Sequence, residues 1–257
     1  MIYGVCCGLG MAPAVADAGY DYVELTVGTA LVPFDTDEAF ARMLETLRQL
    51  PLPCRAVNVF APASLRLTGP DIDPAAQEKY GMCVCARARA AGIPTIVLGA
   101  GGARHVPAGF DRAEALRQFA AFSALLAQIA LDHGVTIGLE ALSPTECNFI
   151  TSVADAAGVV RAAEHPGLRL TVDGYHWACA HDSAEALLNA GPLIVHTHIA
   201  TWPNRLAPGG EDCPLALFTS ALKEAGYDGS MSVEAAIKDP HIDLPHALSV
   251  LRGLMAH

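Results

Sequence analysis

The chain has 257 residues, of which 52% are hydrophobic and 17% are charged, and its formal net charge is −11 at pH 7. This length permits one barrel or two small domains, and the apolar content is sufficient for a sizeable core. The 16 lysines and arginines are scattered along the chain. Because contacts with phosphate require clustered positive charge, we expect no nucleic-acid partner.

The cysteines and the N-terminus indicate the compartment. The eight cysteines include no C-x-x-C pair, and Cys6-Cys7 and Cys83-Val84-Cys85 are too closely spaced for ordinary disulfides or a zinc ribbon. Free thiols are typical of the reducing cytosol. The N-terminus lacks the basic region and cleavage site of a signal peptide, and no apolar run reaches roughly 18 residues. We therefore expect a cytoplasmic protein with no membrane partner.

In the first half of the chain, short apolar segments alternate with longer amphipathic ones. Strands are predicted at residues 2–7, 22–25, 54–60 and 95–98, and helices at residues 11–18, 35–50, 74–91 and 111–133. Thr36 or Asp37 is a suitable N-cap for the second helix. Glu24 lies in the second strand, where a structural carboxylate and a substrate-contacting carboxylate are both open interpretations.

The second half repeats the alternation. Strands are predicted at residues 136–140, 169–173, 194–198 and 230–234, and helices at residues 152–164, 183–190, 214–225 and 244–255. Strand and helix thus alternate eight times with no break in composition and no linker. This pattern predicts an α/β fold in which residues 1–257 form one (β/α)8 TIM barrel, rather than an open doubly wound sheet.

Each of the last four strands contains one candidate metal ligand at its end: Glu140, Asp173, His198 and Glu234. Within each strand, the candidate shares its side of the alternation with small or polar residues, and the opposite side is apolar. The apolar side is therefore expected to face the helices. Since functional groups of such barrels lie at the carboxyl ends of the strands, four consecutive strands would bring these side chains together.

Three carboxylates and one imidazole form an oxygen-rich donor set. Such a set favours Mn²⁺ or Mg²⁺, with Co²⁺ or Zn²⁺ as alternatives. Two further residues, Glu146 and His176, follow closely after two of these strands and could hold substrate hydroxyls. The alternatives are a charge near a helix start for Glu146 and a packed or solvated loop histidine for His176. His196 is interpreted as barrel filling or as a second layer behind the ligands.

These residues resemble the pattern of the xylose isomerase-like sugar isomerases and epimerases. That superfamily includes ketose 3-epimerases and hydroxypyruvate isomerases, and it shares its barrel with endonuclease IV. Its pattern is a metal Glu with a second Glu six residues later, Asp-x-x-His, a His followed by Arg and Pro-Gly, and a final metal Glu. The corresponding residues here are Glu140 with Glu146, Asp173 with His176, His198 with Arg205 and Pro208-Gly209, and Glu234.

The resemblance implies one divalent ion, bound by the four residues at the strand ends, and a small carbohydrate substrate. It further implies that Glu140 and Glu234 exchange the substrate proton, and that Glu146, His176 and Arg205 hold substrate oxygens. The family arginine usually follows the metal histidine by six residues, whereas Arg205 follows His198 by seven. The role of Arg205 and the identity of the substrate therefore stay open.

The hypothesis from these features is an isomerase or epimerase that moves a proton through an enediolate stabilised by the ion. The sequence does not choose between epimerisation and aldose–ketose isomerisation. The alternatives are a dehydratase of a keto-inositol or keto-sugar acid, a non-catalytic sugar-binding barrel and, least favoured, a phosphodiesterase of the endonuclease IV type. The last would need further histidine ligands, and residues 57–59 and 97–99 supply none.

Two smaller points remain open in the sequence. Residues 99–103 are rich in glycine and follow a strand, but no Lys-Ser/Thr follows, so a tight turn is favoured over a phosphate loop. Arg104 and His105 are alternative anchors for a substrate phosphate or carboxylate. The mean hydropathy of +0.33 leaves a homo-oligomer as an open alternative.

Overall fold

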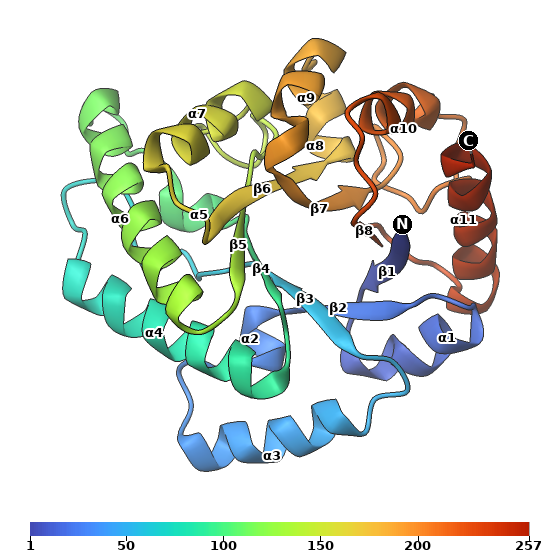
Figure 1. Ribbon diagram of the computed structural model, residues 1–257, viewed down its shortest axis with the longest axis horizontal. Helices are drawn as coiled ribbons and strands as arrows, with labels where there is room; N and C mark the ends of the chain where they lie inside the picture. The colour runs from blue at the N-terminus through green and yellow to red at the C-terminus, as the bar shows by residue number, and fades with distance from the viewer. Residues whose placement is uncertain (257) are drawn as a thin grey trace.

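Eight parallel strands form a closed barrel in the computed structural model, which describes residues 1–256 (Figure 1). The strands are β1 (Ile2–Cys6), β2 (Tyr22–Thr26), β3 (Cys54–Asn58), β4 (Thr95–Leu98), β5 (Thr136–Glu140), β6 (Leu168–Asp173), β7 (Ile194–Ile199) and β8 (Ser230–Val233). Their order around the barrel equals their order along the chain, and β8 pairs with β1 to close it. The predicted (β/α)8 TIM barrel is thereby confirmed.

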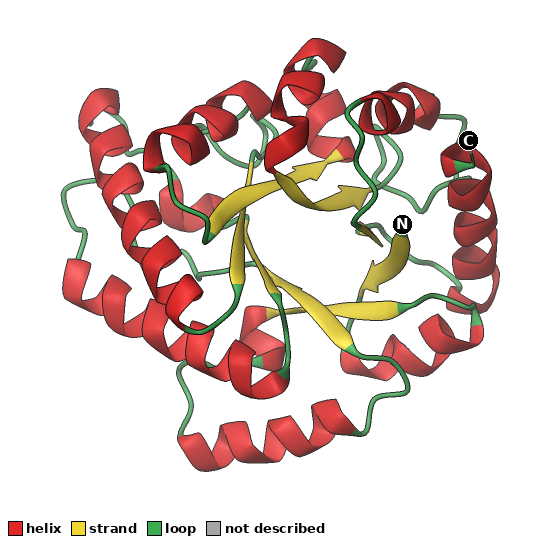
Figure 2. Cartoon of the chain, viewed as in Figure 1, coloured by secondary structure: helices red, strands yellow, loops and turns green. Residues whose placement is uncertain are grey.

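The helices surround the barrel as an outer layer (Figure 2). They are α1 (Ala12–Asp17), α2 (Val27–Ala30), α3 (Asp37–Arg48), α4 (Pro74–Ala91), α5 (Gly101–Arg104), α6 (Arg112–Asp132), α7 (Val153–Ala163), α8 (Gly174–Cys179), α9 (Ala184–Ala190), α10 (Leu215–Glu224) and α11 (Pro240–Met255). Two short 3-10 helices, Leu9–Met11 and Gly191–Leu193, precede α1 and β7.

Side-chain caps begin several of these helices, and Thr36 is one of the two caps predicted for α3. The Thr36 hydroxyl accepts a hydrogen bond from the Ala39 amide over 3.3 Å at the start of α3. The Asp73 carboxylate accepts hydrogen bonds from the Ala75 and Ala76 amides at the start of α4. Pro74 occupies the first position of this helix, where its lack of an N–H loses no helical hydrogen bond. A cap of this kind stabilises a helix by about 1 kcal/mol.

Three expectations are corrected by the structure. β3 ends at Asn58 rather than at residue 60, because Val59 adopts a left-handed φ of 52° that a strand cannot contain. Residues 99–103 form more than a tight turn, since α5 begins at Gly101. The last helix begins at Pro240, four residues earlier than predicted, because Asp239 caps it. Short helices such as α5 span too few residues for a helical repeat to be visible in the sequence.

The inner face of the barrel combines glycines with larger polar side chains. A Cβ on Gly4 would lie 2.2 Å from the ring of Tyr22, and a Cβ on Gly138 would lie 2.2 Å from the Thr171 hydroxyl. The glycines therefore make room for side chains from the neighbouring strands. On the opposite face of β5, Ile137 and Leu139 are fully buried beneath the helices, as the alternation predicts.

Among residues 1–256, no helix combines the length and apolarity needed to cross a membrane. The eight cysteines are all free thiols, in agreement with the spacing argument.

Candidate metal centre and adjoining cavity

The strand register brings the four predicted ligands to one end of the barrel. Asp173 of β6 is paired with His198 of β7, and His198 is paired with Ser232 of β8, two residues before Glu234. Glu140 is the last residue of β5. One donor atom from each of the four lies within 4.8 Å of the corresponding atoms of the other three.

The imidazole of His198 lies among the carboxylates. Its Nδ1 atom is 3.0 Å from Glu140 Oε1 and 3.5 Å from Glu234 Oε2, and the ring is fully buried. Asp173 caps α8, since its Oδ1 accepts a hydrogen bond of 2.7 Å from the Tyr175 amide. That bond fixes the carboxylate, so that Oδ2 faces the neighbouring site residues.

The donor set fits a divalent ion. Three carboxylate oxygens and one imidazole nitrogen are ligands that Mn²⁺, Mg²⁺ and Zn²⁺ all accept. Burial raises the pKa of Glu234 to about 8, and the nearby charges of Glu140 and Asp173 add to this shift against the opposing effect of His198. Carboxylates crowded in this way are stabilised by a positive charge placed between them.

Gly99, directly after β4, leaves the space that Glu140 occupies. A Cβ at Gly99 would lie 2.1 Å from Glu140 Oε2. No side chain fits there without displacing the carboxylate. The glycine-rich segment, for which a tight turn was predicted, thus has a definite steric role beside the candidate metal centre.

Arg205 reaches the centre despite its unusual spacing from His198. Its Nη2 donates to Glu234 Oε2 over 2.6 Å and to Asp173 Oδ2 over 3.4 Å, and its Nη1 donates to Glu146 Oε1 over 2.9 Å. The guanidinium also lies 4.7 Å from the ring centre of Tyr175. A left-handed φ of 53° at Arg205 turns the chain after residues 202–204, so the additional residue is taken up in the loop.

His176 lies between Glu146 and Asp173, the last residue of β6. Its Nε2 is 3.6 Å from Asp173 Oδ2 and 3.9 Å from Glu146 Oε2. Its Nδ1 accepts a hydrogen bond from the Ser143 amide over 3.2 Å. In the neutral ring the proton is therefore on Nε2, directed towards the carboxylates.

These side chains border a cavity of about 300 Å³. Its lining residues are Asn58, Val59, Gly99, Glu140, Leu142, Glu146, His176, Arg205, Glu234 and Ala235. Asn58 was missed in the sequence, although it ends β3 at the same barrel rim as the predicted ligands. Its Nδ2 donates to Glu234 Oε1 over 2.9 Å, and its buried Oδ1 has no hydrogen-bond partner.

Glu24 lies below the candidate ligands and does not line this cavity. It is fully buried, and its two oxygens lie 2.8 Å and 2.9 Å from Nε2 of His196 and Nε2 of His198. Burial alone would raise the pKa of Glu24, but His198 and His196 together hold that pKa well below its usual range. His196 thus lies in a second layer behind the candidate ligands, as expected. A substrate contact by Glu24 is not supported.

The structure does not support Arg104 as a substrate anchor. Its side chain is fully buried and donates to the carbonyl oxygens of Leu98 and Ile150. Arg104 therefore connects the end of β4 to the segment before α7, and its guanidinium does not line the cavity.

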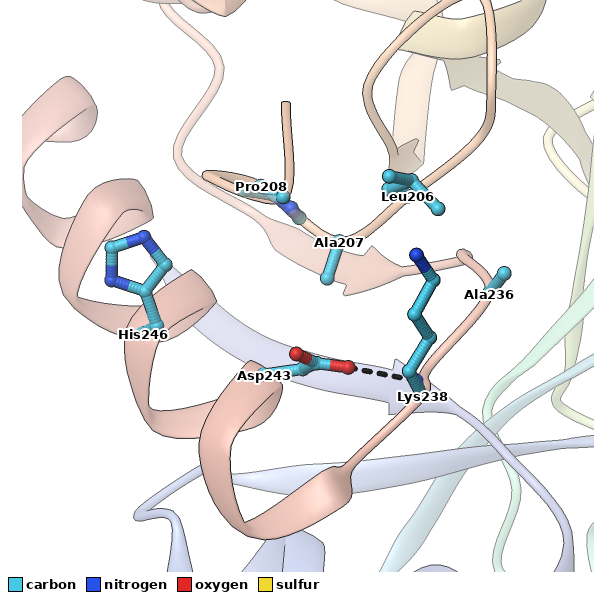
Figure 3. Close-up of a pocket in the computed structure, with 8 residues that line it drawn as sticks. Leu206, Ala207, Pro208, Ala236, Lys238, Asp243 and His246 are labelled. Carbon is cyan, nitrogen blue, oxygen red and sulfur yellow. Dashed lines mark hydrogen bonds between the residues drawn. The ribbon is translucent and has the colours of Figure 1, made fainter. Parts of the chain in front are cut away.

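A smaller cavity of about 140 Å³ lies between the segment after β7 and the start of α11 (Figure 3). Leu206, Pro208, Lys238 and His246 are among its lining residues. The Lys238 amide donates to Asp243 over 2.7 Å within this lining. The residues proposed for the metal centre are not among the lining residues. This cavity is therefore separate from the site described above.

The fold and the donor cluster define a (β/α)8 barrel protein with a candidate divalent-metal centre at the carboxyl ends of its strands. The chain belongs to the xylose isomerase-like TIM-barrel family, whose model matches residues 12–254.

Individual relatives are sugar epimerases. L-ribulose 3-epimerase of Methylomonas sp. (strain DH-1) is 27% identical over 249 residues, which cover 93% of this chain and 82% of that protein. D-psicose 3-epimerase of Ruminiclostridium cellulolyticum is 28% identical over 114 residues, which cover 44% of this chain and 39% of that protein.

Two solved structures share the fold of this chain. D-psicose 3-epimerase in the presence of D-fructose has a TM-score of 0.85 at 18% identity, with both chains covered completely. The IOLI protein with a bound zinc atom has a TM-score of 0.76 at 18% identity, and the match covers 100% of this chain and 98% of that one.

Proposed function

We propose that this protein is a divalent-metal-dependent isomerase or epimerase of a sugar or sugar-like ketone. The observation that carries the proposal is the meeting of Glu140, Asp173, His198 and Glu234 within 4.8 Å beside a cavity of about 300 Å³. The names of the relatives, which are sugar 3-epimerases, support the same class of reaction.

Those four residues would hold the ion. When bound, the ion would polarise a substrate carbonyl and stabilise the negative charge of an enediolate. The donor set is compatible with Mn²⁺ or Mg²⁺, and the zinc atom in the IOLI structure keeps Zn²⁺ among the alternatives.

Glu140 and Glu234 are the proposed proton carriers. Both border the cavity, and each is a carboxylate able to take a proton from a carbon next to a carbonyl and to return one. Glu234 is held at both oxygens, by Asn58 Nδ2 at Oε1 and by Arg205 Nη2 at Oε2. Its pKa of about 8 is close to neutral pH, which suits a group that alternates between base and acid.

Arg205, Glu146 and His176 are the proposed contacts for substrate oxygens. They lie together on one side of the cavity, with Arg205 Nη1 bonded to Glu146 and His176 Nε2 directed to the same carboxylate. The donors and acceptors of these side chains bond to one another in the structure. Hydroxyl groups of a bound carbohydrate would replace these bonds with bonds to the substrate.

The test has two stages. Elemental analysis of the purified protein identifies the ion, and a panel of ketoses, hydroxypyruvate and inososes is then incubated in D₂O with the metal-loaded protein. We expect deuterium to enter one carbon of at least one compound, with the epimer or isomer as product. Loss of water from an inosose would instead identify a dehydratase. Binding of these compounds with no exchange and no product would contradict an enzymatic function.

A further inference from the structure

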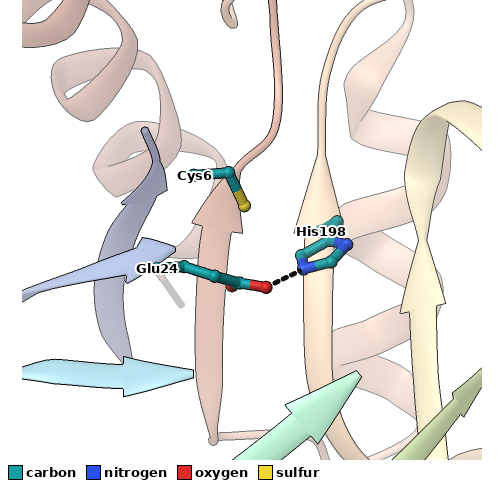
Figure 4. Close-up of side chains that lie close together, drawn as sticks. All are labelled: Cys6, Glu24 and His198. Atoms are coloured by element: carbon teal, nitrogen blue, oxygen red, sulfur yellow. Dashed lines mark hydrogen bonds and ion pairs between the residues drawn. The ribbon is translucent and has the colours of Figure 1, made fainter. Parts of the chain in front are cut away.

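Glu24 connects two histidines of β7 inside the barrel. Its Oε1 lies 2.9 Å from His198 Nε2, and its Oε2 lies 2.8 Å from His196 Nε2. Oε2 also accepts a hydrogen bond of 2.6 Å from the Ser232 hydroxyl. Figure 4 shows the carboxylate of Glu24 directed at the ring of His198, with Cys6 beside the pair.

We propose that Glu24 is a positioning residue that holds His198 with its Nδ1 lone pair facing the metal centre. The inference rests on the metal centre of the proposed function and assigns a residue outside it. A carboxylate only accepts hydrogen bonds, so His198 donates to it from Nε2. A neutral imidazole carries one proton, and Nδ1 is then the nitrogen that is free to bind an ion.

The geometry on the other side of the ring agrees with this assignment. Nδ1 is the His198 atom that lies 3.0 Å from Glu140 and 3.5 Å from Glu234. The barrel interior offers Nε2 of His198 an acceptor, Glu24 Oε1, that is itself fully buried. A half-turn of the ring about its Cβ–Cγ bond would place carbon atoms where Nδ1 and Nε2 now lie, and Nε2 and the carboxylate would lose this bond, which is costly inside a protein.

His196 does not compete for the ion, although it is equally buried. Its Nε2 is directed to Glu24, and its Nδ1 is 2.7 Å from the Ser230 hydroxyl. Both of its nitrogens are therefore engaged by residues of the barrel interior. The rings of His196 and His198 are perpendicular, at 89°, with centres 4.9 Å apart. Glu24 thus contacts both histidines, and of the two only His198 has a nitrogen, Nδ1, that faces the other candidate ligands.

The variants Glu24→Gln and Glu24→Leu separate the acceptor from the negative charge. Glutamine retains one oxygen, which can still accept from His198, whereas leucine of similar size accepts nothing. Tyr22→Phe is a matched control, because it removes a buried hydroxyl that bonds to Ser232 on the far side of Glu24. The dissociation constant for Mn²⁺, measured by calorimetry on each folded variant, is the first readout.

We expect the dissociation constant to rise from wild type to Glu24→Gln and again to Glu24→Leu, by about 10- to 100-fold in total, as for other residues behind a metal ligand. Tyr22→Phe should bind Mn²⁺ as wild type does, because the described hydrogen bond of its hydroxyl goes to Ser232 and not to Glu24 or His198. If Glu24→Gln and any folded Glu24→Leu bind Mn²⁺ as tightly as wild type, the inference is wrong while the metal centre stands.

A second readout needs no variant. The ¹⁵N NMR spectrum of the Mg²⁺- or Zn²⁺-loaded wild-type protein should show His198 protonated at Nε2 and unprotonated at Nδ1. A proton on Nδ1, or coordination through Nε2, would overturn the role of Glu24 whatever the variants do. A wild-type protein that binds no divalent ion would overturn both this inference and the metal centre on which it rests.

Discussion

Arg205 donates a hydrogen bond of 2.6 Å to Glu234, the residue that directly follows β8. The same guanidinium holds Glu146 through its other terminal nitrogen. A proposed proton carrier and a proposed substrate contact are thereby connected by one planar group. In the proposed mechanism, this connection would let one side chain orient the substrate and Glu234 at the same time.

Replacing Arg205 with lysine should lower kcat/KM by about 10- to 100-fold. An ammonium group is a single point charge and cannot bond Glu146 and Glu234 in the fixed geometry of a guanidinium. Losing one hydrogen bond to a charged group costs about 1.5–3 kcal/mol. Arg48→Lys, at an exposed site that pairs only with Glu45 among the described contacts, is the matched control. Wild-type kcat/KM in Arg205→Lys would exclude this role.

Replacing Glu234 with glutamine should lower kcat by about 10²- to 10⁴-fold, the usual contribution of a general acid–base group. The circular dichroism spectrum and melting temperature should stay close to those of wild type, because the amide keeps the size of the side chain. Glu78→Gln changes an exposed glutamate of α4 in the same way and should retain full activity. A fully active Glu234→Gln protein would end the proposed mechanism.

The affinity for a divalent ion should depend on pH through Glu234. Its pKa of about 8 in the ion-free protein means that, below pH 8, the ion must displace a proton to bind the carboxylate. The association constant should therefore rise with pH between pH 6 and 8, by about tenfold per pH unit or more, because the raised pKa of His198 adds a second proton to be displaced. Calorimetry in buffers of different ionisation enthalpy measures the released proton directly. A pH-independent constant between pH 6 and 8 would contradict the assignment.

The stability of the ion-free protein should fall as the pH rises, whereas the affinity for the ion rises. The pKa of Glu234 is raised above its ordinary value of 4.5, so the folded state binds more protons than the unfolded state between pH 4.5 and about 8. Its contribution to the free energy of unfolding is present at low pH and is lost as the pH rises through 8. Denaturant titrations of the ion-free wild type and of Glu234→Gln at pH 5 and 8.5 measure this change in the free energy of unfolding. The part of the change that comes from Glu234 should be absent in the variant.

Replacing Gly99 with alanine should weaken metal binding without unfolding the barrel. The new Cβ would lie 2.1 Å from Glu140 Oε2, so the carboxylate must move away from the other ligands. We expect the dissociation constant for Mn²⁺ to increase by about tenfold or more, equivalent to about 1.4 kcal/mol. Gly158→Ala is the control, because nothing lies within 4 Å of its new Cβ in α7. An unchanged affinity in Gly99→Ala would show that Glu140 does not depend on this space.

Much of the fold is visible in the sequence because it depends on local patterns. Alternation along each strand assigns Ile137 and Leu139 to the helix-covered face and Glu140 to the other, without knowledge of any other strand. The repeated strand–helix spacing then requires parallel strands whose carboxyl ends meet. The same reasoning identified Asp173, His198 and Glu234 as neighbours, and the structure brings them together.

The remaining relationships depend on the register between strands that are far apart in the chain. The bond from Asn58 to Glu234 joins residues 176 positions apart, and the bond from Glu24 to His198 joins residues 174 positions apart. No pattern within one strand indicates which side chain faces another across the barrel, because strand pairing and stagger are properties of the closed sheet. The sequence by itself thus determined the barrel and the candidate ligands, whereas only the tertiary structure decided how Glu24, Asn58 and Arg205 hold them.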